Sequence, residues 1–167
     1  MKLPGQEDKH FEQVVRAYSA DLYRYAYWLC RERFLAEELV QEAFLRAWKG
    51  WRTLRDPAAT KAWLFTIVRN EYARAFARKR IDIVDVDVYE LDIADSRPTV
   101  AGVEGMLAAL PLAYREPLAL QVLGGFSCAE IAAMLHTTEG AVMTRLTRAR
   151  QALRTHEAGR EKQKGAR

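Results

Sequence analysis

The sequence is poor in the residues that build disulfide frameworks, metal centres and many catalytic sites. Its two cysteines, Cys30 and Cys128, lie far apart and give no disulfide framework. Its three histidines, His10, His136 and His156, do not cluster with the cysteines or with one another at metal-ligand spacing. No Ser/His/Asp arrangement, phosphate-binding loop or carboxylate pair stands out. We therefore expect no catalytic residue, no metal site, no cofactor and no enzymatic activity.

Long apolar runs are also absent. No segment approaches the roughly 18 apolar residues that a membrane-spanning helix requires, and the start MKLPGQEDKHFEQ lacks the apolar core of a signal peptide. Half of the 167 residues are hydrophobic and 29% are charged, which is a globular composition. The net charge of +4 is a mild excess that suggests an acidic partner. These features predict a cytoplasmic protein with no membrane insertion of its own.

The sequence does have strong helical periodicity. Apolar residues recur at steps of three and four in the first eighty residues, which is the spacing of amphipathic helices. Three helices are expected there, at about 11–30, 36–48 and 59–80, with a turn at Asp56-Pro57 before the third. Helical patterning returns after Val103. The sequence therefore predicts an all-α fold of two small helical domains.

A stretch of different composition separates the two helical parts. Residues 81–95 read IDIVDVDVYELDIAD, with six acidic side chains and no basic one. The alternation is formally a strand pattern, but no second strand pattern is present to pair with it. We expect helical domains at 1–80 and 104–155, an acidic flexible linker at 81–103 and a basic tail at 156–167, whose end, GREKQKGAR, is expected to be frayed.

The stretch FSCAEIAAMLHTTEGAVMTRLTRAR has the features of a helix-turn-helix. Ser127 and Glu130 are spaced as a capping box, and Phe126 and Ile131 as a hydrophobic staple. Thr138 can cap the second helix, whose exposed threonines and arginines can contact base edges and phosphates. An ordinary antiparallel helix pair with a solvated basic face would have the same spacing, so this stretch alone leaves both interpretations open.

Three blocks of the chain resemble one known family. LQVLGGFSCAEIAAMLHTTEGAVMTRLTRARQALR closely resembles region four, the promoter-recognition domain, of the extracytoplasmic-function (ECF) sigma factors of the sigma-70 family. AEELVQEAFLRAWKGW resembles the core-binding helix of their region two, and KAWLFTIVRNEYARAFARKR their downstream-promoter helix. The resemblance implies a dissociable RNA polymerase subunit that binds core polymerase and promoter DNA and helps to open the DNA, in a stress or envelope response. It also implies a cognate anti-sigma factor.

The resemblance assigns a polymerase-binding role to the second predicted helix. The residues that match the family's helix for the largest polymerase subunit are Glu38, Gln41, Glu42, Phe44 and Trp48. The three polar residues of this set are expected to share one exposed face. Without the resemblance, that face would read as an ordinary solvated helix surface.

The third predicted helix resembles the part that binds the opened minus-ten element. Opening requires rings for unstacked bases and cations for the backbone. The residues that the resemblance assigns to DNA are Lys61, Trp63, Arg69, Asn70, Arg74, Arg78 and Lys79, and the family commonly has an aspartate at the position of Arg74. The helix also carries Phe65, Tyr72 and Phe76, and the pattern does not separate core rings from stacking rings. The loop RTLRDPAAT matches the place where the family captures a flipped base.

In region four, four residues match the surface that faces the major groove of the minus-thirty-five element: Met143, Thr144, Thr147 and Arg148. Arg145 and Arg150 are expected to contact phosphate or to brace the fold. The chain departs from the family at Met143, where lysine or arginine is common, and at His136, where the turn commonly has glycine.

Two questions stay open at this point. The acidic linker either lies in the RNA channel of the polymerase or is a solvated spacer. The alternative to a sigma factor is a free-standing helix-turn-helix transcriptional regulator.

Overall fold

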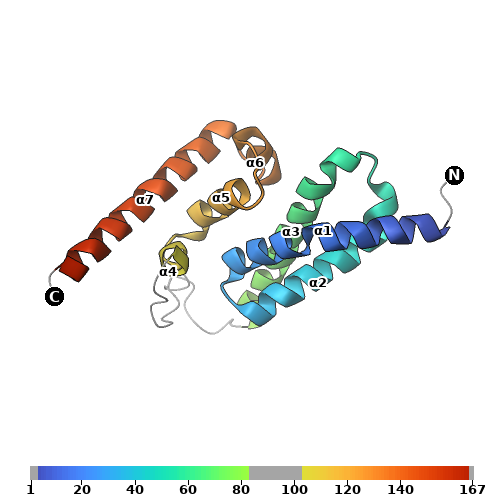
Figure 1. Cartoon of the computed structure of the whole chain (residues 1–167), viewed down its shortest axis with the longest axis horizontal. Helices are drawn as coiled ribbons and strands as arrows, with labels where there is room; N and C mark the ends of the chain where they lie inside the picture. The colour runs from blue at the N-terminus through green and yellow to red at the C-terminus, as the bar shows by residue number, and fades with distance from the viewer. Residues whose placement is uncertain (1–3, 83–102, 166–167) are drawn as a thin grey trace. The chain divides into compact units, whose positions relative to one another are not determined.

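The computed structural model describes residues 4–82 and 103–165, which form two compact units (Figure 1). All regular structure in these two ranges is helical, as the periodicity predicts. Most of the expected acidic linker lies outside the described residues. The structure therefore does not distinguish the two roles expected for it. Ile81 and Asp82 belong to the last helix of the first unit, and Val103 opens the first helix of the second.

The first unit is a bundle of three long helices. They are α1 (Pro4–Cys30), α2 (Arg33–Gly50) and α3 (Thr60–Asp82), and each packs on the other two. Two short 3-10 helices, η1 (Trp51–Thr53) and η2 (Pro57–Ala59), form the loop between α2 and α3. The largest fully buried side chains of the core are Leu22, Tyr25, Leu29, Leu64, Phe65 and Val68.

Side-chain caps decide where two of these elements begin. Helix α2 starts at Arg33, three residues before the predicted start, because the carboxylate of Glu32 accepts hydrogen bonds from the backbone N–H groups of Phe34 (2.9 Å) and Leu35 (2.6 Å). Asp56 caps η2 in the same way, accepting from the Ala58 N–H at 2.9 Å. The predicted turn at Asp56-Pro57 is therefore confirmed.

The second unit consists of four helices around a smaller core. They are α4 (Val103–Ala108), α5 (Leu112–Val122), α6 (Cys128–Met134) and α7 (Glu139–Gly165), and α7 packs on the other three. Gly125, with φ of +68°, ends the α5 segment and lets the chain turn into α6. The most buried side chains are Ala119, Leu120, Ile131, Val142, Leu146 and Ala149.

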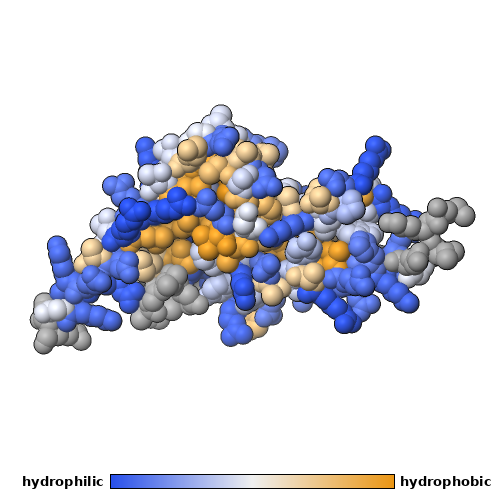
Figure 2. All heavy atoms as spheres, turned by 45° about the horizontal axis from the view of Figure 1, so that its top comes forward, coloured by the Kyte–Doolittle hydropathy of each residue, from blue (hydrophilic) through white to orange (hydrophobic). Residues whose placement is uncertain are grey.

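The prediction that the chain is frayed from Gly159 onward needs correction, because α7 continues to Gly165. Glu157 and Glu161 stand three residues before Arg160 and Lys164, a spacing that stabilises a helix. Almost all side chains of this last part are exposed, and the end of α7 is hydrophilic in the space-filling view (Figure 2).

No described helix combines the length and the apolar character that a membrane crossing demands. Within 4–82 and 103–165, no three His, Cys, Asp or Glu side chains come together as a possible metal site.

Candidate functional site

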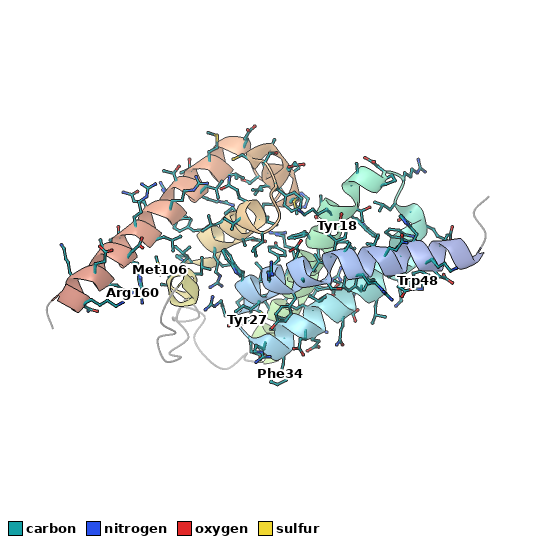
Figure 3. All side chains as sticks on the ribbon, in the orientation of Figure 1. Tyr18, Tyr27, Phe34, Trp48, Met106 and Arg160 are labelled. Carbon is teal, nitrogen blue, oxygen red and sulfur yellow. The ribbon has the colours of Figure 1, made fainter. Side chains whose placement is uncertain are left out.

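An exposed stripe runs along α2, on the side opposite the core. Its five residues follow steps of four and three: Phe34, Glu38, Gln41, Leu45 and Trp48. The three apolar side chains are 80%, 57% and 45% exposed in that order, and Phe34 points away from the helix in Figure 3. The stripe is about 21 Å long at 1.5 Å per residue. We call these five residues the α2 stripe.

Only part of the α2 stripe was predicted from the sequence. Glu38, Gln41 and Trp48 were predicted, whereas Phe34 and Leu45 were not. Their spacing could have revealed both, because they lie three or four residues from the predicted members and so share their face, which is opposite the face of the buried Leu39.

The other two residues of the predicted polymerase-binding set lie beside the stripe. The half-buried Glu42 is not on the same face as Gln41, and its carboxylate lies 3.4 Å from Nε of Arg46. The half-buried Phe44 turns its ring toward Phe11 of α1, with centroids 6.4 Å apart and planes nearly perpendicular.

A buried carboxylate links α2 to α3. Glu71 continues the core stripe of Leu64 and Val68, yet its side chain is a charged group that is only 2% exposed. Burial of a carboxylate is costly unless cations pair with it. Arg46 of α2 and Arg74 of α3 both bind the same oxygen, Oε1 of Glu71. Arg74 therefore folds back on an acid three residues earlier in the same helix.

The structure distinguishes the core rings of α3 from the exposed rings, which the sequence pattern could not do. Phe65 is fully buried against Tyr25, with centroids 5.0 Å apart, so it is a core ring. Trp63 is half-buried, and Tyr72 lies 6.1 Å from Phe76, which is among the exposed large hydrophobic residues. Phe76 is therefore the ring of this helix that is most available for stacking.

The polar residues predicted on α3 differ in exposure. Asn70 and Arg78 are exposed, and Lys61 and Arg69 are half-buried. Lys79 lies in the helix, but its side chain is outside the described residues. The helix thus offers the predicted polar groups on more than one side.

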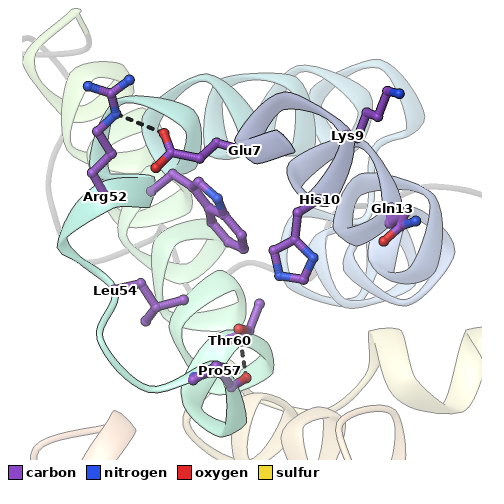
Figure 4. A pocket seen from close by; sticks show the side chains of 9 residues that line it. Glu7, Lys9, His10, Gln13, Arg52, Leu54, Pro57 and Thr60 are labelled. Carbon is purple, nitrogen blue, oxygen red and sulfur yellow. Dashed lines mark hydrogen bonds and ion pairs between the residues drawn. The ribbon is translucent and has the colours of Figure 1, made fainter. Parts of the chain in front are cut away.

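A pocket of about 570 Å³ lies between the start of α1 and the loop that carries η1 and η2 (Figure 4). Glu7 of α1 and Arg52 of η1 form an ion pair at 3.1 Å across its edge. Residues from both elements line it: Glu7, Lys9, His10, Gln13, Trp51, Arg52, Leu54, Pro57 and Thr60. It combines two cations, one amide and a tryptophan with one carboxylate, that of Glu7, which is paired with Arg52. A ring beside cations suits a planar group attached to an anionic chain.

In the second unit, α6 and α7 form the predicted helix-turn-helix. The Ser127 hydroxyl accepts from the Glu130 N–H at 3.2 Å while the Glu130 carboxylate accepts from the Ser127 N–H at 2.7 Å, so the capping box is confirmed. Thr138 caps α7 by accepting from the Ala141 N–H at 3.2 Å. His136 adopts φ of +52° in the turn, as expected for a residue that replaces glycine there.

The buried residues of α6 are Ile131, Ala132 and Met134, and the half-buried Leu135 ends the helix as its C-cap.

The exposed face of α7 carries the four predicted base-reading residues. Met143 is 56% exposed, and Thr144, Thr147 and Arg148 are exposed beside it. The hydroxyls of both threonines donate to backbone carbonyls one turn earlier, at 3.0 and 2.9 Å, so each hydroxyl has its proton engaged and keeps its acceptor lone pairs.

The other two arginines of α7 have different surroundings. The exposed Arg150 donates to the side-chain oxygen of Gln121 on α5, and Arg145 is half-buried. The contact of Arg150 joins α7 to α5 and so braces the fold, which is one of the two roles expected for this residue.

Comparison with known proteins identifies the family. Residues 14–81 match the family described as Sigma-70 region 2, and residues 102–153 match Sigma-70, region 4. The two matches cover most of the chain and coincide with its two units. They define a sigma factor of the sigma-70 family and disfavour a free-standing regulator.

Individual relatives narrow this to one group. The chain is 30% identical over 152 residues to the ECF RNA polymerase sigma factor SigM of Bacillus subtilis, covering 86% of this chain and 92% of SigM. It is 29% identical to the ECF RNA polymerase sigma factor SigE of Mycolicibacterium smegmatis over 87% of this chain but only 61% of SigE. This protein therefore belongs to the ECF RNA polymerase sigma factors.

A solved structure agrees with this assignment. The sigma factor RpoE of Bartonella quintana, crystallised with the anti-sigma factor NepR, superposes with a TM-score of 0.74 at 28% identity. The superposition covers 88% of this chain and 96% of that one.

Proposed function

We propose that this ECF sigma factor binds core RNA polymerase through the α2 stripe. The observation that carries the proposal is the exposure of Phe34, Leu45 and Trp48 on one face of a helix whose opposite face is fully packed. Large apolar side chains that are exposed along one face of a small unit are typical of a protein-binding surface. Glu38 and Gln41, in the middle of the stripe, supply the polar contacts that orient a partner helix.

The first unit also holds the opened minus-ten element. The pocket lined by Trp51 and Arg52 receives a base that has left the stack, and Phe76 stacks another base, while Asn70, Arg78 and other polar residues of α3 contact the strand. Because one nitrogen of Arg74 pairs with Glu71, Arg74 contacts DNA only through its remaining N–H groups.

The second unit reads the minus-thirty-five element as duplex. Met143, Thr144, Thr147 and Arg148 lie in the first three turns of α7, where a recognition helix meets base edges. Arg148 is the strongest donor in this set and suits a guanine edge or a phosphate. Arg145 and Arg150 hold α7 on its own unit or reach phosphate.

Partners, location and activity follow the family. RpoE of Bartonella quintana was solved with an anti-sigma factor, and we expect a cognate anti-sigma factor for this chain too. The chain works in the cytoplasm, in a stress or envelope response, and acts as a binding subunit without enzymatic activity of its own.

The α2 stripe can be tested by direct binding to core polymerase. Trp48→Ala and Phe34→Ala should each lower affinity for core by about 30-fold, the effect of truncating an interface hot spot. Arg33→Ala serves as the control, because Arg33 is exposed on α2 but lies off the stripe. Fluorescence titration of labelled full-length variants with core enzyme gives the affinities. Wild-type affinity in both stripe variants would contradict the proposal.

A further inference from the structure

Phe11, near the start of α1, is the common neighbour of several functional rings. Its buried ring lies 5.1 Å from that of Trp48 and 5.1 Å from that of Trp51, measured between centroids. The pair with Trp51 is edge-on, at 72°, which is a favourable arrangement for aromatic rings. Phe11 belongs to neither of the surfaces proposed above, yet it contacts a residue of each.

The contacts continue from Trp51 to α3. Trp51 lies 6.3 Å from Trp63, and Trp63 packs so closely on the backbone at Gly50 that a Cβ added there would be 3.2 Å from its ring. Trp48, Phe11, Trp51 and Trp63 therefore form a continuous path of rings. It runs from the α2 stripe, past the pocket, to the helix proposed to hold the minus-ten strand.

The ring of Trp51 has its packing partners on α1. Trp51 opens η1 directly after α2, and its backbone N–H still donates to the carbonyl of Trp48, so the end of α2 holds its main chain. The side chain is braced from α1: Phe11 packs on the Trp51 ring, His10 lies 5.5 Å from it, and Glu7 pairs with the next residue, Arg52.

We propose that Phe11 is a positioning residue for promoter opening. Its ring holds Trp51 at the wall of the pocket, so that an unstacked base meets a fixed ring rather than a mobile one. Fixing the ring before binding removes part of the ordering cost of base capture. This inference rests on the proposed role of the pocket. It adds that the start of α1 is part of the opening machinery.

The test compares two templates in the same holoenzyme. A promoter fragment from which the wild-type holoenzyme initiates in vitro is used as intact duplex and again with its minus-ten region premelted. Core enzyme is present at saturation, and core affinity is measured separately, so an effect on Trp48 does not enter the comparison. Because a premelted template needs no strand separation, a residue that acts on opening affects the intact duplex selectively.

Phe11→Leu removes the ring but keeps the site apolar, and Phe11→Met fills more of the volume if the leucine variant is unstable. Either should lower open-complex formation on the intact duplex by about tenfold, the order expected for losing one or two ring contacts. Initiation from the premelted template should stay within about twofold of wild type. Phe11→Tyr should restore opening because it restores the ring. Val14→Ala is the matched control, since Val14 is buried on α1 with similar exposure.

The outcomes separate this inference from the pocket itself. Equal losses on both templates would mean that Phe11 only supports the fold, and would overturn the inference. The inference would also be overturned if Phe11→Leu opened the duplex normally while Trp51→Ala failed to open it. If Trp51→Ala opens the duplex normally, the proposed role of the pocket is wrong, and the inference about Phe11 is wrong with it.

Discussion

The two units differ most in their aromatic side chains. The first unit carries all four tryptophans of the chain and the ring pairs described above, whereas Tyr114 and Phe126 are the aromatic residues among the described part of the second. An opened strand presents base faces, which rings can cover. A closed duplex presents base edges in a groove, which a slender helix with polar side chains can reach. The distribution of rings thus matches the two states of DNA that the units are proposed to bind.

The units also differ in how polar groups stabilise them. The first unit buries a charge, Glu71, and holds it with two arginines from two helices. The second unit has no buried charged residue among those described, and both units use side-chain caps at helix ends, such as the capping box of Ser127 and Glu130 in the second. Removing a partner from a buried charge costs more than removing a surface cap. This difference can be measured.

The largest effect on stability is expected for Arg46→Ala. It should lower the free energy of unfolding of the first unit by about 2–3 kcal/mol, because Glu71 stays buried with one arginine fewer. The value lies below the roughly 3–5 kcal/mol of a fully buried pair because Arg46 is half exposed and Arg74 remains. Chemical denaturation followed by circular dichroism measures it. Arg16→Ala, which breaks the exposed pair with Glu12, should change stability by less than about 0.5 kcal/mol. Similar values for the two variants would contradict this account of Glu71.

A second effect concerns recognition by α7. Arg148→Ala should reduce discrimination among minus-thirty-five variants by about 1–3 kcal/mol at one position if the guanidinium contacts a base edge. If it contacts phosphate, binding should weaken about equally for all variants and the salt dependence should fall. Initiation rates on a set of upstream-element variants separate these two contacts. Arg154→Ala, an exposed arginine further along α7, is the control. An unchanged profile would remove Arg148 from the reading surface.

The smallest effect is expected at the cap of α6. Ser127→Ala should destabilise the second unit by about 1 kcal/mol, a typical value for loss of an N-cap side chain. Ser127→Asp should recover most of that loss, since aspartate caps equally well. Thermal unfolding of the full-length variants provides the comparison. If Ser127→Asp were as unstable as Ser127→Ala, the cap would not be the cause.

Local patterns were sufficient to predict much of this architecture. The helices of both units, the capping box, the Thr138 cap and the strained turn at His136 all follow from periodicity and from residues one to four positions apart. The start of α2 was placed too late because Glu32, an uncommon cap, was not recognised. The sequence pattern predicts too early an end for α7, because its last segment is charged and has few apolar residues, which is typical of a frayed end.

Features that join distant segments could not be predicted in this way. Glu71 reads as a solvated acid in the sequence, and only the approach of Arg46 from another helix makes its burial possible. The pocket needs the ion pair of Glu7 and Arg52, which are 45 residues apart. The bracing contact of Arg150 with Gln121 likewise depends on the packing of α5 against α7. Such pairs are set by tertiary packing, which no single-segment pattern contains.

The central claim is that the first unit acts on opened DNA and the second on duplex DNA. Its most direct test is initiation by full-length Trp51→Ala and Arg148→Ala holoenzymes on one promoter, as intact duplex and with the minus-ten region premelted. The account predicts that premelting reduces the Trp51→Ala defect by about fivefold or more, because strand separation, the step that base capture by the pocket supports, is no longer needed on that template. The Arg148→Ala defect should be the same on both templates. A Trp51→Ala defect that persists after premelting, or an Arg148→Ala defect that disappears, would contradict this division of roles.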